Sequence, residues 1–316
     1  MRISGFSFAK NAVKLYFPIK QAVASILPLV DEFVVAVGDC DADDRTREVL
    51  LELNSPKLRI IDTRWDLDAY PRGMENAHQT DLAKAACTGD WLFYLQADEV
   101  IHEKYLPVIE QRCQELLHDE EVEGLLFGYQ HFWGDYQHVH RAHGWYRQEI
   151  RIVRNRPDIH SWESAQSFRV IPNFDGVNYR QQEGTRKLKV AQVAAEVYHY
   201  GWVRPPALMQ AKSKALDTIH KGSAAANALH QGRPQAFDYG DMSRIPQFEG
   251  THPKVMREFV AQFDWGDQLR FSGGNPANRP LYKHEKLRYR LLSWLENHLP
   301  GQPELGGFHN YTLLKR

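Results

Sequence analysis

Over the first hundred residues, short apolar runs alternate with longer segments in which apolar and polar residues have helical spacing. The run at residues 33–37 reads Phe-Val-Val-Ala-Val, which is typical of a strand buried on both faces of a parallel sheet. The predicted strands are residues 3–8, 33–37, 58–61 and 91–95, and the predicted helices are residues 19–29, 44–53 and 74–87. This β-α-β-α-β-α-β order predicts a parallel sheet with crossover helices.

The pattern changes near residue 124, where aromatic and β-branched runs are joined by loops rather than by long helices. We expect these runs to add mixed or antiparallel strands to the first sheet. They are residues 125–133, 149–153, 168–171 and 193–200. Pro206 then begins a helix that Gly222 ends. Two more helices are predicted at residues 253–263 and 282–298, so we divide the chain into an α/β domain at residues 1–205 and a mainly helical region at residues 206–316.

Composition and charge exclude several classes of protein. The chain has 316 residues, with Lys plus Arg at 39 and Asp plus Glu at 40, so no overall basic field exists to hold a nucleic acid. Its three cysteines form no CxxC pair, and no secretory signal or long apolar run is present. We therefore expect a cytoplasmic protein. The basic side chains of the helix at residues 282–298 leave peripheral contact with the inner face of a membrane open.

Two adjacent acids, Asp98 and Glu99, follow the apolar run that ends at Leu95. Ligands bind at the carboxyl ends of strands in open α/β sheets, and carboxylate oxygens there suit Mg²⁺ or Mn²⁺ bridging a diphosphate. The alternative is that the two acids favour the start of a following helix through its dipole.

An ordered set of motifs adds a resemblance. It comprises Asn11, the run at residues 30–35, the acidic turn at residues 39–46, Asn76 and the segment at residues 89–99. Over residues 1–205 the chain resembles family 2 glycosyltransferases of the GT-A fold, in particular bacterial members that act on cell-surface glycans. The resemblance implies a GT-A-like mixed sheet flanked by helices. It also implies inverting, metal-assisted transfer of a sugar from a nucleotide-diphosphate donor to a saccharide or lipid-linked glycan acceptor.

The resemblance also implies residue roles. Asp98, Glu99 and His199 would hold a divalent cation, Mn²⁺ or Mg²⁺, and Glu163 would be the general base beside the catalytic Asp98. The donor would be contacted by Asp39, Asp62, Arg72, Gln96 and Arg204. One departure is that Gln96 stands where the family has the first carboxylate of its Asp-Ala-Asp-Glu motif. An amide brings no charge, so metal affinity is expected to weaken.

Aromatic residues are dense between Tyr129 and Trp162, and such a region suits a saccharide acceptor because sugar rings pack on aromatic faces. Core packing is the alternative for about half of them. No phosphate-binding GxxxxGK[ST] loop, GxGxxG turn, GxSxG elbow or HExxH zinc motif is present. The main alternative function is a non-catalytic nucleotide- or glycan-binding protein on a transferase-like fold. A sugar nucleotidyltransferase ranks lower, because residues 7–14 contain no glycine run.

Overall fold

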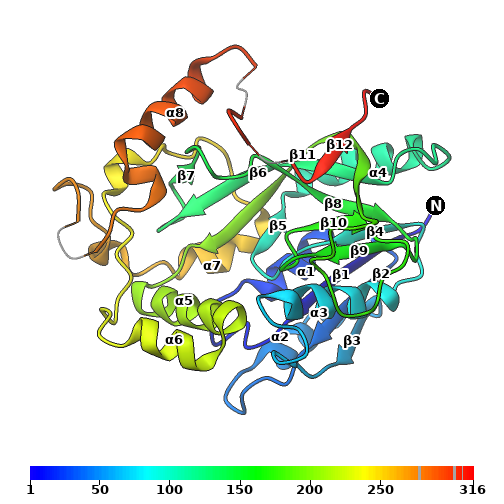
Figure 1. Cartoon of the computed structure of the whole chain (residues 1–316), viewed down its shortest axis with the longest axis horizontal. Coiled ribbons are helices and arrows are strands. Elements are labelled where there is room, and N and C mark those ends of the chain that lie inside the picture. Colours follow the sequence, from blue (N-terminus) through cyan, green and yellow to red (C-terminus); the bar gives the residue numbers. More distant parts are fainter. Residues whose placement is uncertain (277–278, 302–303, 308) are drawn as a thin grey trace.

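The computed structural model describes residues 1–276, 279–301, 304–307 and 309–316. Its first half is a parallel sheet with crossover helices, as the sequence predicts (Figure 1). The strands are β1 (Ile3–Ala9), β2 (Glu32–Val37), β3 (Leu58–Asp62) and β4 (Trp91–Tyr94), in the spatial order β3-β2-β1-β4. The helices between them are α1 (Ile19–Ile26), α2 (Thr46–Leu51) and α3 (Met74–Ala85).

The second half extends the same sheet with mixed pairing. Beyond β4 the order continues β8-β6-β11-β10-β9, where β8 runs antiparallel to β4 and β6, and β11 runs parallel to β6. These strands are β6 (Gly124–Trp133), β8 (Gln148–Arg154), β9 (Ile159–Trp162), β10 (Ser167–Val170) and β11 (Arg186–Trp202). Three short strands complete the sheet, namely β5 (Glu99–Ile101), β7 (Val139–His140) and β12 (Tyr311–Leu313). The predicted fold class, an α/β fold with a GT-A-like mixed sheet flanked by helices, is confirmed.

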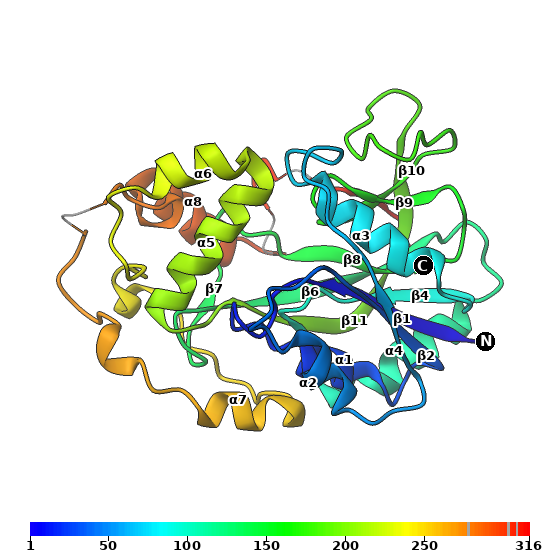
Figure 2. The same cartoon turned by 90° about the horizontal axis from the view of Figure 1, so that it is seen from below.

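Alternation along the strands places a separate core on each face of the sheet. Phe33, Val35 and Phe93 face α1 and α4 (Leu106–Glu115), whereas Phe6 and Tyr94 face the side that α3 covers. Figure 2 shows α1, α2 and α4 below the sheet and α3 above it. Because β1, β2 and β4 are buried on both faces, a ligand can reach these strands only at their ends.

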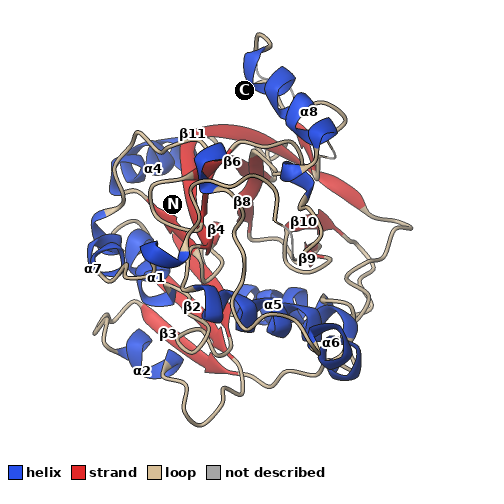
Figure 3. Ribbon diagram, turned by 90° about the vertical axis from the view of Figure 1, so that its left-hand side faces the viewer, coloured by secondary structure: helices blue, strands red, loops and turns tan. Residues whose placement is uncertain are grey.

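The region after residue 205 packs against the ends of β6 and β11. Its helices are α5 (Pro206–Lys221), α6 (Ser223–His230), α7 (Arg257–Ala261) and α8 (Leu287–His298). Figure 3 shows α5 and α6 next to each other, with α8 apart from them. A third apolar cluster joins Trp133 and Tyr200 to Met242 and Trp265, so the two predicted domains share a core. The division at residue 205 stays a prediction.

The predicted helix at residues 282–298 begins later than expected, at Leu287. Residues 283–285 form a 3-10 turn instead, because the buried Glu285 is held by Arg279 and by the backbone N–H of Tyr282. The exposed side chains of α8 include Leu287, Leu291 and Trp294. No helix in the described part of the chain is long and apolar enough to cross a bilayer.

Candidate active site

A cavity of about 480 Å³ opens at the carboxyl ends of β1 and β4. We call it the Asp98 cavity. Its polar wall includes Lys10, Gln96, Asp98, His199 and Lys212, and its aromatic wall includes Phe17, Trp65, Trp145, Tyr146 and Trp202. It lies at the edge of the sheet where open α/β folds bind their ligands. The sequence predicted Gln96, Asp98 and His199 at such a place, and the structure brings these three together.

Asp98 is buried in the turn after β4 and faces two nitrogen atoms from distant parts of the chain. Its Oδ2 atom lies 3.4 Å from Nζ of Lys212 on α5 and 3.7 Å from Nε2 of His199 on β11. Burial alone would raise the pKa of Asp98, but the charges of Lys212, His199 and Arg204 hold it well below its usual value. These charges therefore favour the ionised form of the Asp98 carboxylate.

Arg204 lies behind this cluster and is fully buried. None of its three guanidinium nitrogen atoms makes a hydrogen bond within the described residues, and its Cζ atom lies 4.5 Å from the centre of the Phe17 ring. Burial lowers the pKa of Arg204 to about 10. Burial and the charge of Arg204 also lower the pKa of Lys212 to about 7, although Asp98 opposes this. When Lys212 is protonated, the charges of Lys212 and Arg204 both act on the one carboxylate of Asp98.

Glu99 has a different set of partners from its neighbour Asp98. Its two carboxylate oxygens accept hydrogen bonds from Nε and Nη2 of Arg151 on β8, both at 2.7 Å, and the Tyr129 hydroxyl donates to one of them at 2.8 Å. Both members of the pair are buried. Removing one partner from such a pair typically costs about 3–5 kcal/mol of stability. Glu99 therefore ties β5 to β6 and β8.

This geometry does not fit the metal site that the sequence predicted at Asp98, Glu99 and His199. Both oxygens of Glu99 are taken by Arg151, and the Gln96 amide donates to the carbonyl of Ala165 at 2.9 Å. Within the ranges that the structure describes, no group of three or more His, Cys, Asp or Glu side chains could hold a metal ion. Of the three predicted metal ligands, Asp98 and His199 line the cavity, beside Lys212, and Glu99 does not.

His199 is oriented by a second histidine. Nε2 of the buried His131 lies 2.7 Å from the carbonyl oxygen of Tyr146, which can only accept, so this nitrogen carries a proton. Burial lowers the pKa of His131 well below its usual value, so its ring is neutral and its Nδ1 atom accepts. The Nδ1 atom of His199, 2.8 Å away, is then the donor. This assigned network turns Nε2 of His199 toward Asp98.

Asp39 lies beside the cavity rather than in its wall. Its Oδ1 atom accepts hydrogen bonds from Lys10 Nζ at 2.8 Å and from the backbone N–H of Trp65 at 3.0 Å. Lys10 and Trp65 both line the cavity, and Lys10 Nζ lies 5.5 Å from the centre of the indole ring. The indole Nε1 atom of Trp65 is buried without a hydrogen-bond partner in the described chain. No motif or periodic pattern marks Trp65 in the sequence, because it lies in a loop after β3.

Three other predicted residues are not in the cavity wall. The side chain of Asp62 is 74% exposed and pairs with Arg47, because β3 is the outer strand of the sheet. Arg72 is exposed in the turn before α3. Glu163 lies in the turn between β9 and β10, with a φ of 55° and a carboxylate oxygen 3.8 Å from Arg180, whereas its neighbour Ser164 does line the cavity. The roles of these three residues stay predictions.

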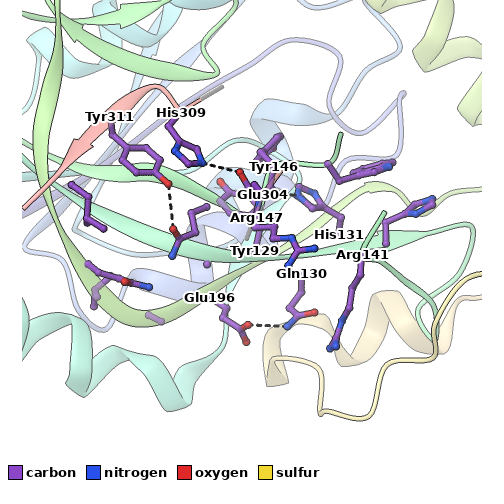
Figure 4. A pocket seen from close by; sticks show the side chains of 18 of the residues that line it. Tyr129, Gln130, His131, Arg141, Tyr146, Arg147, Glu196, Glu304, His309 and Tyr311 are labelled. Atoms are coloured by element: carbon purple, nitrogen blue, oxygen red, sulfur yellow. Dashed lines mark hydrogen bonds and ion pairs between the residues drawn. The ribbon is translucent and has the colours of Figure 1, made fainter. Parts of the chain in front are cut away.

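A second cavity, of about 720 Å³, lies over β6, β8 and β11 and shares Trp145 and Tyr146 with the first. We call it the Gln130 cavity (Figure 4). Its side chains are mostly polar, with Gln130 Nε2 donating to Glu196 at 2.8 Å and His309 lying 3.0 Å from Glu304. Tyr129 and Trp145 are among its aromatic residues. Other aromatic residues of the same segment, including Phe132 and Trp133, belong to the core, as the alternative interpretation expected.

No family model and no curated protein matches the sequence. Among solved structures, the chain is similar to glucosyl-3-phosphoglycerate synthase from Mycobacterium tuberculosis in complex with Mn²⁺, uridine diphosphate and phosphoglyceric acid. The identity is 21% and the TM-score 0.29, over 40% of this chain and 43% of that one. It is also similar to S. aureus TarS 1–349, with 13% identity and a TM-score of 0.36, over 72% of this chain and 68% of that one.

The chain thus spans less than half of the synthase that it matches. A further structure of that synthase contains Mg²⁺ and uridine diphosphate, with the same identity and TM-score. At this level of similarity, the two proteins assign no residue role to this chain.

The close packing around Asp98 is testable at Gly201. A Cβ atom there would lie 2.7 Å from Oδ2 of Asp98 and would also overlap the ring of His199. We expect Gly201→Ala to lower the free energy of unfolding by about 1–3 kcal/mol, measured by urea denaturation, because both buried groups must move. The control is Gly266→Ala, where the new Cβ would lie 3.4 Å from the Phe263 ring, an ordinary contact. Equal stability of the two variants would contradict the packing described here.

Proposed function

We propose that the protein is a nucleotide-sugar-dependent glycosyltransferase. The observation that carries this proposal is the buried Asp98 paired with Lys212 in the wall of a cavity at the carboxyl edge of the sheet, with the buried Arg204 behind them. Two cations that share one carboxylate favour an anionic ligand, and a diphosphate brings the missing charge. The volume of about 480 Å³ is in the range of cavities that enclose a ligand of nucleotide-sugar size.

The nucleoside end of the donor would lie beside Lys10, Asp39 and Trp65. The indole ring offers a flat face for a base, and its buried Nε1 atom offers a donor that still needs an acceptor. The Asp39 carboxylate is held at the end of β2 by Lys10 and can accept hydrogen bonds from a base or ribose. The diphosphate would then lie at Lys212, with the sugar toward Asp98.

The acceptor would enter through the Gln130 cavity. Its mixture of amide, carboxylate and aromatic side chains suits the hydroxyls and C–H faces of a saccharide. Because Trp145 and Tyr146 line both cavities, an acceptor hydroxyl there would lie next to the donor sugar. Contact with a membrane and a lipid-linked acceptor stay predictions, for which binding of the chain to anionic lipid vesicles is the direct measurement.

For the chemical step we retain an inverting displacement. A base takes the proton of the acceptor hydroxyl, the new bond forms at the anomeric carbon, and the electron pair of the broken bond goes to the leaving diphosphate. Glu163 is the proposed base. The support for Glu163 is its position in the turn, because the nearby residues Ser164 and Gln166 line the Asp98 cavity.

The direct test of the function is turnover. With UDP-, GDP- and dTDP-sugars and a panel of saccharide acceptors, we expect release of the nucleoside diphosphate from one base series. Asp98→Asn should lower kcat/KM by about 10- to 100-fold, because it removes the charged acceptor that holds Lys212 at the cavity.

Asp267→Asn, an exposed acid outside the Asp98 cavity, is the matched control and should leave turnover unchanged. If a nucleotide binds without any turnover, including hydrolysis, the non-catalytic binding protein is the better description. Full activity of Asp98→Asn would overturn the assignment of the site.

Glu163→Gln separates a base from a binding residue. Since a general base typically contributes about 10²- to 10⁴-fold, we expect kcat to fall by at least about 100-fold while donor KM stays within about twofold. Asp175→Asn, at an exposed acid outside the Asp98 cavity, is the control. Unchanged kcat in Glu163→Gln would remove this residue from the mechanism.

A further inference from the structure

The positive charges around Asp98 oppose the binding of a divalent cation to its carboxylate. Asp98 is the one carboxylate among the described residues that line its cavity, whereas Lys10 and Lys212 both line it and Arg204 lies just behind. A divalent cation placed against Oδ2 of Asp98 would lie within a few ångströms of the Lys212 ammonium. In a buried, weakly screened position, that repulsion opposes binding of the metal and favours binding of an anion.

One of the two predicted carboxylate ligands is already occupied by another partner. Mg²⁺ and Mn²⁺ at a donor diphosphate usually take one or two protein carboxylates. Here the second carboxylate, Glu99, is bound at both oxygens by Arg151, and the Gln96 amide is turned to Ala165. Gly201 closes the space between Asp98 and His199, and its carbonyl oxygen is taken by Lys212 at 2.6 Å.

Lys212 is placed as a phosphate-binding cation. An ammonium has three N–H donors, and the carbonyl of Gly201 and Oδ2 of Asp98 account for two of them. Phe17 and Trp202 flank the ammonium, at 5.1 Å and 5.6 Å from Nζ to the ring centres, and limit its movement. Lys212 also lines the wall of the Asp98 cavity, where a ligand could accept from its third donor.

Arg204 supplies the second, independent observation. Its side chain is fully buried, yet its three nitrogen atoms make no hydrogen bond within the described chain. Buried donors without partners are rare in folded proteins, and a buried cation needs a compensating charge. Asp98 already serves Lys212, so an anionic ligand in the cavity would supply the charge that Arg204 lacks.

We propose that this site binds the donor diphosphate without a divalent cation, and that the Lys212 ammonium, supported by the charge of Arg204, takes the place that a metal would hold. This inference rests on the proposed transferase function. When the bond between the anomeric carbon and the diphosphate oxygen breaks, the electron pair goes to that oxygen, and Lys212 stabilises the added charge. The proton of the acceptor hydroxyl goes to the general base, so no metal and no further reactant is needed.

Calorimetric titration of the full chain with UDP, GDP and dTDP tests this proposal, once with EDTA and once with excess Mn²⁺ or Mg²⁺. We expect one nucleoside diphosphate to bind with a Kd in EDTA that is within about twofold of the Kd with metal. Lys212→Met should weaken this binding by at least about tenfold, and Lys212→Arg, which keeps the charge, should retain most of it. Lys214→Met is the matched control, because Lys214 is exposed on the same helix and outside the Asp98 cavity.

The outcomes separate the two proposals. Binding that requires the metal would overturn this inference and leave the proposed function in place. Absence of binding for all three nucleotides in both conditions would overturn the proposed function itself. Thermal unfolding of each variant shows whether it is folded, and if Lys212→Met is unfolded, the wild-type comparison with and without EDTA still decides the metal question. Wild-type affinity in a folded Lys212→Met variant would also overturn the inference.

Discussion

Two adjacent carboxylates are buried at the end of β4, and each must have its own counter-charge. Glu99 obtains it from Arg151 on the neighbouring antiparallel strand, and Asp98 obtains it from Lys212 on a helix more than a hundred residues later. The first pair fixes the sheet below the site. The pair of Asp98 and Lys212 joins α5 to the end of the sheet, and both of its members line the cavity.

The two ion pairs differ in hydrogen bonding and in charge balance, and this difference suits one of them to bind a ligand. Glu99 and Arg151 satisfy each other with two short hydrogen bonds, so they form a closed structural unit. Asp98 and Lys212 lie farther apart, and Arg204 adds a positive charge that no described hydrogen bond compensates. A closed pair stabilises a fold, whereas an open cluster with excess charge is suited to a ligand of the opposite sign. The two cavities that meet at Trp145 and Tyr146 then place this anion site beside a polar, aromatic space.

Much of the fold could be predicted from the sequence because its signals are local. The β-branched run at β2, the aromatic and apolar run at β4, and the helix boundaries that proline and glycine mark at α5 depend on neighbouring residues alone. The pairing of Glu99 with Arg151 could not be predicted in this way, since it depends on β8 lying next to β4 with the opposite direction. A signal was nevertheless present, because an arginine within an apolar strand needs a buried acid.

Only part of the site could be predicted, because the sequence shows which residues end a strand but not which strands are central. Residues at the ends of central strands, such as Asp98, reach the cavity, whereas Asp62 is the last residue of the outer strand β3 and its side chain is exposed. The metal set of Asp98, Glu99 and His199 stays a prediction, and Glu99 is held by Arg151 because adjacent residues in a turn can face different partners. Lys212 carried no signal beyond helical spacing.

The most direct measurement is a crystal structure of the full chain with the nucleoside diphosphate that it binds, grown in EDTA. The account predicts a terminal phosphate oxygen about 2.7–3.0 Å from Nζ of Lys212 and the base beside Trp65, with no cation between the phosphate and Asp98. A diphosphate bound outside the Asp98 cavity, or with its phosphates turned away from Lys212, would contradict it.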